Sequence, residues 1–174
     1  MLDREYHEES ELMDDELFAD FVASTCLFKS VRRNAKYSPI DYMGMDKKGR
    51  ICSIELKRRN FNMDRYKSIF IEPEKAWHLI NRYEQYDLIP LYVNFFDDGV
   101  LMFDLRKYEK PNIELEHKKV KIYNNGHNEE QNVWRMELPT DDAIRYIRED
   151  NGEYVYVDGR KTEQGKEECT DRPS

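Results

Sequence analysis

The sequence predicts an α/β protein in which a mixed β-sheet is flanked by helices. Two segments, about 11–25 and 73–86, repeat apolar residues at helical spacing. Short runs rich in β-branched and aromatic residues, separated by turn signals, lie between and after them. The predicted order is helix, two strands, helix, two strands, then a strand pair and a last helix. Because strands and helices do not alternate one for one, a doubly wound parallel sheet is not expected.

The first half of this pattern ends in a hairpin. A polar N-terminal stretch, residues 1–10, is expected to be flexible. The helix 11–25 and a basic connection follow, with a short strand at Leu27 and Phe28. Pro39 disfavours helical geometry at Ser38 and so introduces a hairpin with strands at about 40–45 and 51–57.

The second helix and the central strands follow a polar loop over residues 58–72. Pro73 suits the first turn of the helix 73–86. Residues 89–96 are too apolar for an exposed strand and predict a central one. A turn at residues 97–99 then leads into a returning strand, about 100–105.

The C-terminal part is expected to add smaller elements. Strands at 118–123 and 132–138 are predicted around a loop at residues 124–126, and a last helix at about 141–149. We expect one folded domain over residues 11–150. Residues 151–174 are expected to hold an edge strand, in the stretch YVYVDG, and a disordered tail.

The charges are unevenly distributed. The net charge is −8, and residues 1–20 hold nine acids against one arginine. Residues 29–67 hold twelve bases and four acids. This basic segment fits either a binding surface for a polyanion or a solvated charged face, and charge alone leaves both open. No apolar run is long enough to span a membrane, and the acidic N-terminus is unlike a signal peptide, so a cytoplasmic protein without membrane contact is expected.

The hairpin brings two carboxylates together. A three-residue turn at Lys47–Gly49 would pair Asp46 with Arg50 and therefore place Asp41 directly opposite Glu55. Like charges at this position are destabilising, with Cβ atoms roughly 4.5–5.5 Å apart. Lys57 lies on the face of Glu55, while residues 54 and 56 point into the core.

Two facing carboxylates favour a hard divalent cation with oxygen ligands. Mg²⁺ would take Asp41, Glu55 and the main-chain carbonyl of Leu56, with water at the remaining positions. Such an ion activates bound water and neutralises charge on a phosphoryl oxygen. Lys57 would orient the attacking water or stabilise the transition state.

Pro39-Ile40-Asp41, thirteen residues, and then Glu55-Leu56-Lys57 resemble the motif of the PD-(D/E)XK nuclease superfamily. The resemblance extends over roughly residues 11–105. One residue, Ile40, separates the proline from the aspartate. The resemblance implies a restriction-endonuclease-like core and Mg²⁺-dependent phosphodiester hydrolysis, with Mn²⁺ able to substitute. Holliday-junction resolvases and phage-type nucleases belong to this superfamily.

The resemblance also implies further residues and partners. Glu16 would be the acid that the first helix adds to the site, ahead of Glu11 and Asp20, and Lys75 would be an assisting helical lysine. The arginines that follow the motif would contact phosphates: Arg58, Arg59 and Arg65. The expected partner is DNA in preference to RNA, with branched DNA as one form and a homodimer as one option for assembly.

A second class of function stays open beside the nuclease. The chain could keep this fold as a non-catalytic binding or regulatory module that contacts a protein partner through its acidic ends. The complete set of Asp41, Glu55 and Lys57 favours the nuclease, because a degenerate copy is expected to have lost a member.

Overall fold

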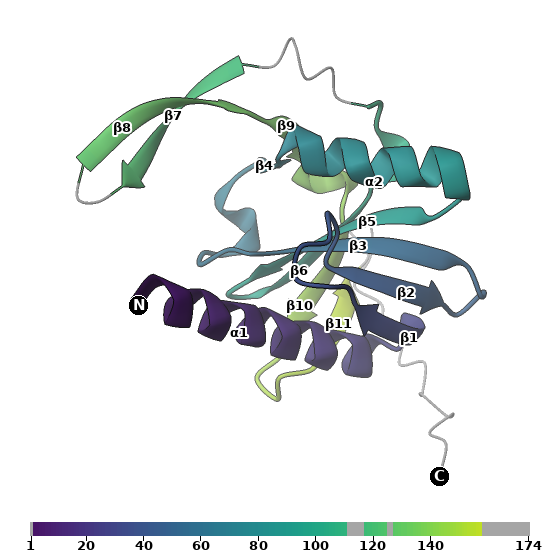
Figure 1. Ribbon diagram of the computed structural model, residues 1–174. Coiled ribbons are helices and arrows are strands. Elements are labelled where there is room, and N and C mark those ends of the chain that lie inside the picture. The colour runs from purple at the N-terminus through teal and green to yellow at the C-terminus, as the bar shows by residue number, and fades with distance from the viewer. Residues whose placement is uncertain (1, 111–116, 125–126, 158–174) are drawn as a thin grey trace.

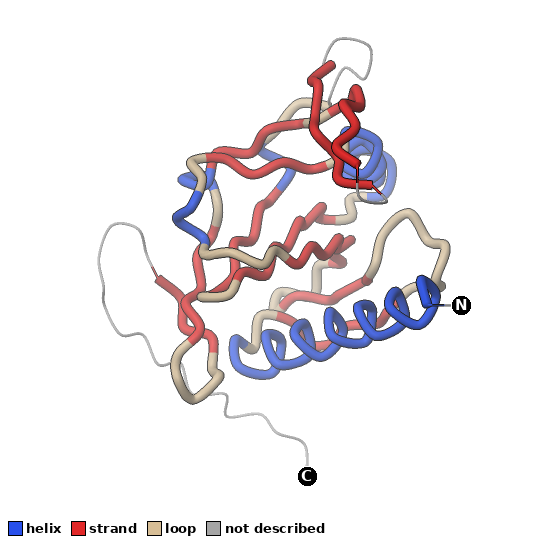
Figure 2. The backbone as a smooth tube through the Cα atoms, turned by 90° about the vertical axis from the view of Figure 1, so that its left-hand side faces the viewer, coloured by secondary structure: helices blue, strands red, loops and turns tan. Residues whose placement is uncertain are grey.

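A seven-stranded mixed sheet forms the centre of the molecule, with α1 (Leu2–Thr25) along one face and α2 (Pro73–Tyr86) along the other (Figure 1). The computed structural model describes residues 2–110, 117–124 and 127–157, and side chains within 12–110 and 135–157. Figure 2 shows the two helices on opposite sides of the strands. The predicted mixed sheet flanked by helices is confirmed.

The strand order is β1-β2-β3-β5-β6-β10-β11. β3 and β5 are parallel, with α2 between them in sequence, and the other neighbours are antiparallel. The strands are β1 (Phe28–Arg33), β2 (Tyr42–Asp46), β3 (Ile51–Arg58), β5 (Ile89–Phe96), β6 (Gly99–Asp104), β10 (Ile144–Arg148) and β11 (Tyr154–Val157).

Two further sheets have two strands each. β4 (Ser68–Ile71) pairs with β9 (Met136–Pro139), and β7 (His117–Asn124) pairs with β8 (His127–Trp134). Short 3₁₀ turns lie at Met63–Arg65, Leu105–Lys107 and Thr140–Asp142.

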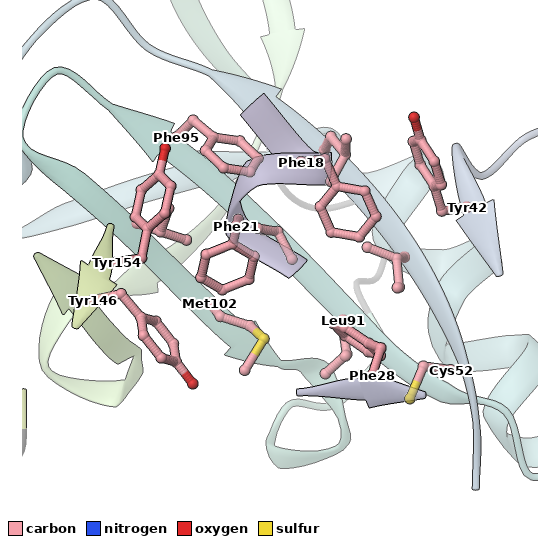
Figure 3. Close-up of a cluster of buried hydrophobic side chains, with 14 of the residues drawn as sticks. Phe18, Phe21, Phe28, Tyr42, Cys52, Leu91, Phe95, Met102, Tyr146 and Tyr154 are labelled. Carbon is pink, nitrogen blue, oxygen red and sulfur yellow. The ribbon is translucent and has the colours of Figure 1, made fainter. Parts of the chain in front are cut away.

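The core between α1 and the sheet is rich in aromatic side chains (Figure 3). Phe18 and Phe21 of α1 are fully buried. The Phe21 ring makes edge contacts with Tyr146, Tyr154 and Phe95, at centroid distances of 5.0, 5.4 and 6.0 Å. Edge-to-face packing of this kind adds to the free energy gained by burial. These rings fix the rotation of α1 about its axis, and so decide which of its residues face the hairpin.

A second core lies between the opposite face of the sheet and α2. Ala76, Leu79 and Ile80 of α2 are buried in it, together with residues of the β4–β9 sheet. Alternate residues of β3 therefore face two different cores. Ile54 and Leu56 face α1, as expected, and Glu55 faces α2.

Four elements in the interior of the chain differ from the prediction. The predicted helix 141–149 is wrong: a 3₁₀ turn is followed by β10, because the isoleucines and tyrosine of Ile144–Arg148 pair with β6 and β11. β4 lies in a segment expected to be a loop. The predicted strand 132–138 is divided between β8 and β9. β1 extends well beyond the expected Leu27–Phe28.

The remaining predictions concern the ends of the chain. α1 begins at Leu2 instead of residue 11, and residues 2–10 are rich in the helix formers Glu, Leu and Arg. The edge strand in YVYVDG is confirmed as β11. The tail expected to be disordered lies outside the described residues from 158 onward. No helix in the described part of the chain combines the length and hydrophobicity needed to cross a membrane.

Candidate active site

The β2–β3 hairpin has the register that the sequence predicts. Tyr42 pairs with Ile54, and the main-chain N–H of Asp46 donates to the Arg50 carbonyl at 2.9 Å. Gly49 has φ +80°, the left-handed conformation that favours glycine in such a turn. Asp41 lies one residue before β2, and its N–H donates at 3.1 Å to the carbonyl of Ile54, the residue before Glu55.

Glu55 is a buried acid with one free oxygen. Its side chain is 2% exposed, and its Oε1 forms an ion pair with Lys75 Nζ of α2. Its Oε2 is buried and accepts no hydrogen bond from the described residues. An unsatisfied buried carboxylate oxygen is costly, so this atom is a natural ligand position for a cation.

Asp41 is held by the strand that carries Glu55. Its Oδ2 accepts a hydrogen bond from the Leu56 N–H at 2.8 Å. The carboxylate is partly exposed and lines a cleft of about 280 Å³. Lys57 is exposed and lines the same cleft. The hairpin thus places the Asp41 carboxylate and the Lys57 ammonium at one opening.

The cleft lies where α1, the hairpin and α2 come together. Acidic and basic side chains both line it: Asp14, Asp15, Asp41, Arg33, Lys57, Arg58 and Lys75. Tyr42, Leu56 and Asn60 complete the lining. Glu55 adjoins this cleft through its ion pair with Lys75. Mixed charge of this kind can hold both a cation and the phosphates that a cation neutralises.

Asp14 of α1 lines the cleft, whereas Glu16 does not. Asp14 precedes the buried Phe18 by one helical turn, so both lie on the sheet-facing side of α1. Glu16 and Asp20 are exposed and do not line the cleft. The side chain of Glu11 lies outside the described part. The expectation for Glu16 is corrected here, because the two buried phenylalanines set the rotation of the helix.

The surroundings of Asp14 act on its protonation. Burial raises the pKa of Asp14, Arg58 lowers it, and the Asp41 carboxylate raises it further. Asp14 Oδ1 lies 3.2 Å from Arg58 Nε but makes no well-aligned hydrogen bond with it. Asp14 and Asp41 both line the cleft, where the negative charge of each acts on the other.

Asp15 was not predicted from the sequence, and it connects three elements. Its Oδ1 accepts from the Tyr42 hydroxyl and its Oδ2 forms an ion pair with Arg33. Burial raises the pKa of Tyr42, and the hydrogen bond to Asp15 raises it further, so the hydroxyl stays a donor. This cluster fixes α1 against β1 and β2 at the cleft.

The three arginines expected to contact phosphates have different surroundings. Arg58 lines the cleft. Arg65 is exposed outside the cleft lining, with its guanidinium 5.4 Å from the Tyr66 ring and 5.5 Å from the Phe61 ring. Arg59 is buried, which corrects the expectation for that residue.

Arg59 belongs to a buried polar network on the α2 side of the sheet. Its Nε donates to Asn94 Oδ1 at 2.9 Å, and its Nη2 donates to the Phe70 carbonyl at 2.7 Å and the Tyr92 hydroxyl at 3.2 Å. These bonds hold β4 against β5. The residue therefore supports the fold near the site and is not available to a ligand.

Replacing Arg59 with alanine should lower the free energy of unfolding by about 2–4 kcal/mol, because it leaves buried acceptors without donors. Urea denaturation followed by circular dichroism measures the change. Arg65→Ala, the same substitution at an exposed position, should change the value by less than about 0.5 kcal/mol. Equal effects of the two variants would contradict a structural role for Arg59.

The donor set at the hairpin fits a hard divalent cation. Asp41 and Glu55 supply carboxylate oxygens, and the unpaired Oε2 of Glu55 lacks a positive partner. Among the described residues, no group of three or more His, Cys, Asp or Glu side chains is placed so that it could hold a metal ion. Mg²⁺ usually keeps several waters and is bound by one or two carboxylates, so two such ligands suffice.

Comparison with known proteins yields a distant structural likeness. No protein-family model matches the sequence, and no curated protein matches it. Among solved structures, the chain is similar to Hjc, a Holliday junction resolvase from the archaeal hyperthermophile Archaeoglobus fulgidus. The TM-score is 0.43 and the identity is 12%, over 57% of this chain and 79% of that chain. The roles of individual residues therefore rest on the geometry of the site itself.

Proposed function

We propose that this protein is a metal-dependent nuclease that hydrolyses phosphodiester bonds in DNA, of the PD-(D/E)XK type that the sequence motif resembles. The observation that carries the proposal is the hairpin register. Beside it, the Asp41 N–H donates to the Ile54 carbonyl and the Asp41 carboxylate accepts from the Leu56 N–H, so Asp41 would lie next to the buried Glu55. The Oε2 of Glu55 accepts no hydrogen bond from the described residues, and Lys57 lines the same cleft as Asp41. Neighbouring carboxylates are unfavourable in a hairpin that serves the fold alone.

Asp41 and Glu55 would hold Mg²⁺, with the Leu56 carbonyl as a third ligand and Mn²⁺ as a substitute. Asp14 would take the place of Glu16 as the acid of α1 at this cleft, without being a third side-chain ligand of the ion. Such an ion, when bound, lowers the pKa of coordinated water and neutralises charge on a phosphoryl oxygen. The Leu56 N–H keeps the Asp41 carboxylate directed across the hairpin.

Lys57 would act on the phosphodiester itself. Its ammonium is exposed at the cleft, where it can donate hydrogen bonds to a non-bridging oxygen and stabilise charge that grows as water attacks. Lys75, paired with Glu55, would orient that carboxylate. Arg58 would hold a flanking phosphate, because it directly follows Lys57 in the sequence and lines the cleft.

The proposal is tested by incubating the purified protein with branched, linear duplex and single-stranded DNA, in Mg²⁺, in Mn²⁺ and in EDTA. We expect cleavage of at least one substrate with either metal and none in EDTA. Cleavage that is equally fast in EDTA would contradict metal dependence. Binding of DNA or of a protein partner, with no cleavage in any condition, would favour the non-catalytic module.

A further inference from the structure

The loop between β1 and β2 begins and ends at the cleft. Arg33, the last residue of β1, and Asp41, which follows the loop, both line it. The base of the loop is fixed, because the Asn34 N–H donates to the Asp41 carbonyl at 2.8 Å. Asn34 Nδ2 also donates to the Ile40 carbonyl at 3.2 Å. The buried Ile40 anchors the loop in the core under α2.

The tip of this loop presents an aromatic ring to solvent. The Ser38 N–H donates to the Ala35 carbonyl at 2.8 Å, and this turn places Lys36 and Tyr37 at its corner. Tyr37 is 94% exposed, the highest value among the large hydrophobic side chains that the structure describes. A flat ring held on a tied loop is suited to stacking against another flat ring.

Two observations relate Tyr37 to the cleft: its short distance along the chain from residues that line it, and the bases around it. Tyr37 is four positions along the chain from Arg33 and four from Asp41, so its Cα lies at most about 14 Å from either Cα. Residues 29–37 also carry four bases and no acid: Lys29, Arg32, Arg33 and Lys36. Of these bases Arg33 lines the cleft, so a nucleic-acid strand that continues from the cleft along this segment would meet positive charge and then an aromatic platform.

We propose that Tyr37 stacks on an unpaired nucleobase of the bound DNA, next to the phosphodiester held in the cleft. This inference rests on the proposed nuclease function and names its substrate class. The substrate is DNA with unpaired nucleotides beside the point of cleavage, because a base inside a continuous duplex has no free face to offer. Blunt duplex would be bound through its phosphates alone.

The test measures the affinity of the full chain, in EDTA, for a fluorescently labelled single-stranded DNA and for a blunt duplex of the same sequence. Tyr37→Ala should weaken single-strand binding by about 5- to 150-fold, which corresponds to roughly 1–3 kcal/mol for one stacked base. Its duplex binding should change less than about two-fold. Tyr37→Trp should restore single-strand binding, because indole also stacks.

Tyr86→Ala is the matched control, since Tyr86 is also an exposed tyrosine. It lies eleven residues after Lys75 on α2, about 16 Å further along the helix. We expect no change in this variant. Unchanged single-strand binding in Tyr37→Ala, or an equal loss for duplex, overturns the inference.

The two proposals fail in different ways. If Tyr37→Ala binds every DNA as the wild type does while metal-dependent cleavage persists, the stacking role is wrong and the nuclease stands. If the wild type cleaves no DNA, and Tyr37→Ala nevertheless loses single-strand binding, the nuclease proposal is wrong and the stacking proposal stands.

Discussion

Asp41→Asn should reduce metal-dependent DNA cleavage by on the order of 10³-fold while the protein stays folded. The amide is neutral and a poor ligand for a hard cation, so the charge that balances the metal is lost. The asparagine carbonyl oxygen can still accept the hydrogen bond that Asp41 Oδ2 takes from the Leu56 N–H. The effect should therefore fall on cleavage and metal affinity, and hardly on stability.

Single-turnover cleavage, calorimetric titration with Mg²⁺ and thermal unfolding measure the three quantities separately. Asp46→Asn is the matched control, because Asp46 lies on the same hairpin and also accepts main-chain hydrogen bonds, from Lys48 and Arg50. It should leave cleavage and metal affinity unchanged. Wild-type cleavage by Asp41→Asn would remove Asp41 from the site.

Elements with strong local signals could be predicted from the sequence. α2 begins at Pro73 and ends at Tyr86 as expected, because Pro73 marks its start and its apolar positions repeat at helical spacing. β5 has the predicted bounds, because its continuous apolar run fits only a central strand. The hairpin register followed from the glycine in its turn. In each case the deciding residues are neighbours in sequence.

Elements that depend on distant partners could not be predicted in this way. Ser68–Ile71 becomes a strand only because Met136–Pro139 lies beside it, and nothing near residue 68 indicates that pairing. Ile144–Arg148 follows helix-capping residues, yet it forms strand β10, because β6 pairs with it on one side and β11 on the other. Tertiary pairing decides such segments and overrides local propensity.

The candidate site shows the same limit. Asp14 and Glu16 are both acids on one helix, and only the burial of Phe18 and Phe21 decides which of them faces the hairpin. The stripe of residues that placed Glu16 on the inner face of this helix runs through Ala19 and Ala23. Weighting the large aromatics above these two small alanines would have given the correct face. Arg59 follows the motif directly, but its burial depends on partners in β4 and β5.

Lys75→Met should destabilise the metal-free protein by about 3 kcal/mol and strengthen its binding of Mg²⁺. Lys75 supplies the positive partner of Glu55, whose side chain is 2% exposed. Removing one member of a buried pair leaves the other charge uncompensated. Lys75 itself is 44% exposed, so the lower end of the usual range applies.

Lys110→Met is the matched control, because Lys110 also pairs with a glutamate of α2, Glu84, which is 50% exposed. Solvent already screens that pair, so we expect less than about 1 kcal/mol of destabilisation. Lys75→Arg keeps the charge and should stay near wild-type stability. Urea denaturation with and without Mg²⁺, together with calorimetric titration, provides the measurements.

The effect of Mg²⁺ on the stability of Lys75→Met shows whether Glu55 is a metal ligand or a buried acid that serves only the fold. If Glu55 holds the cation, Mg²⁺ replaces the missing ammonium, and the deficit of Lys75→Met should shrink as metal is added. In the wild type the Lys75 ammonium lies beside Glu55 and repels the cation, so the wild type should bind Mg²⁺ more weakly than the variant. A deficit that is equal with and without Mg²⁺ would mean that no metal reaches Glu55, and that the Lys75–Glu55 pair serves the fold alone.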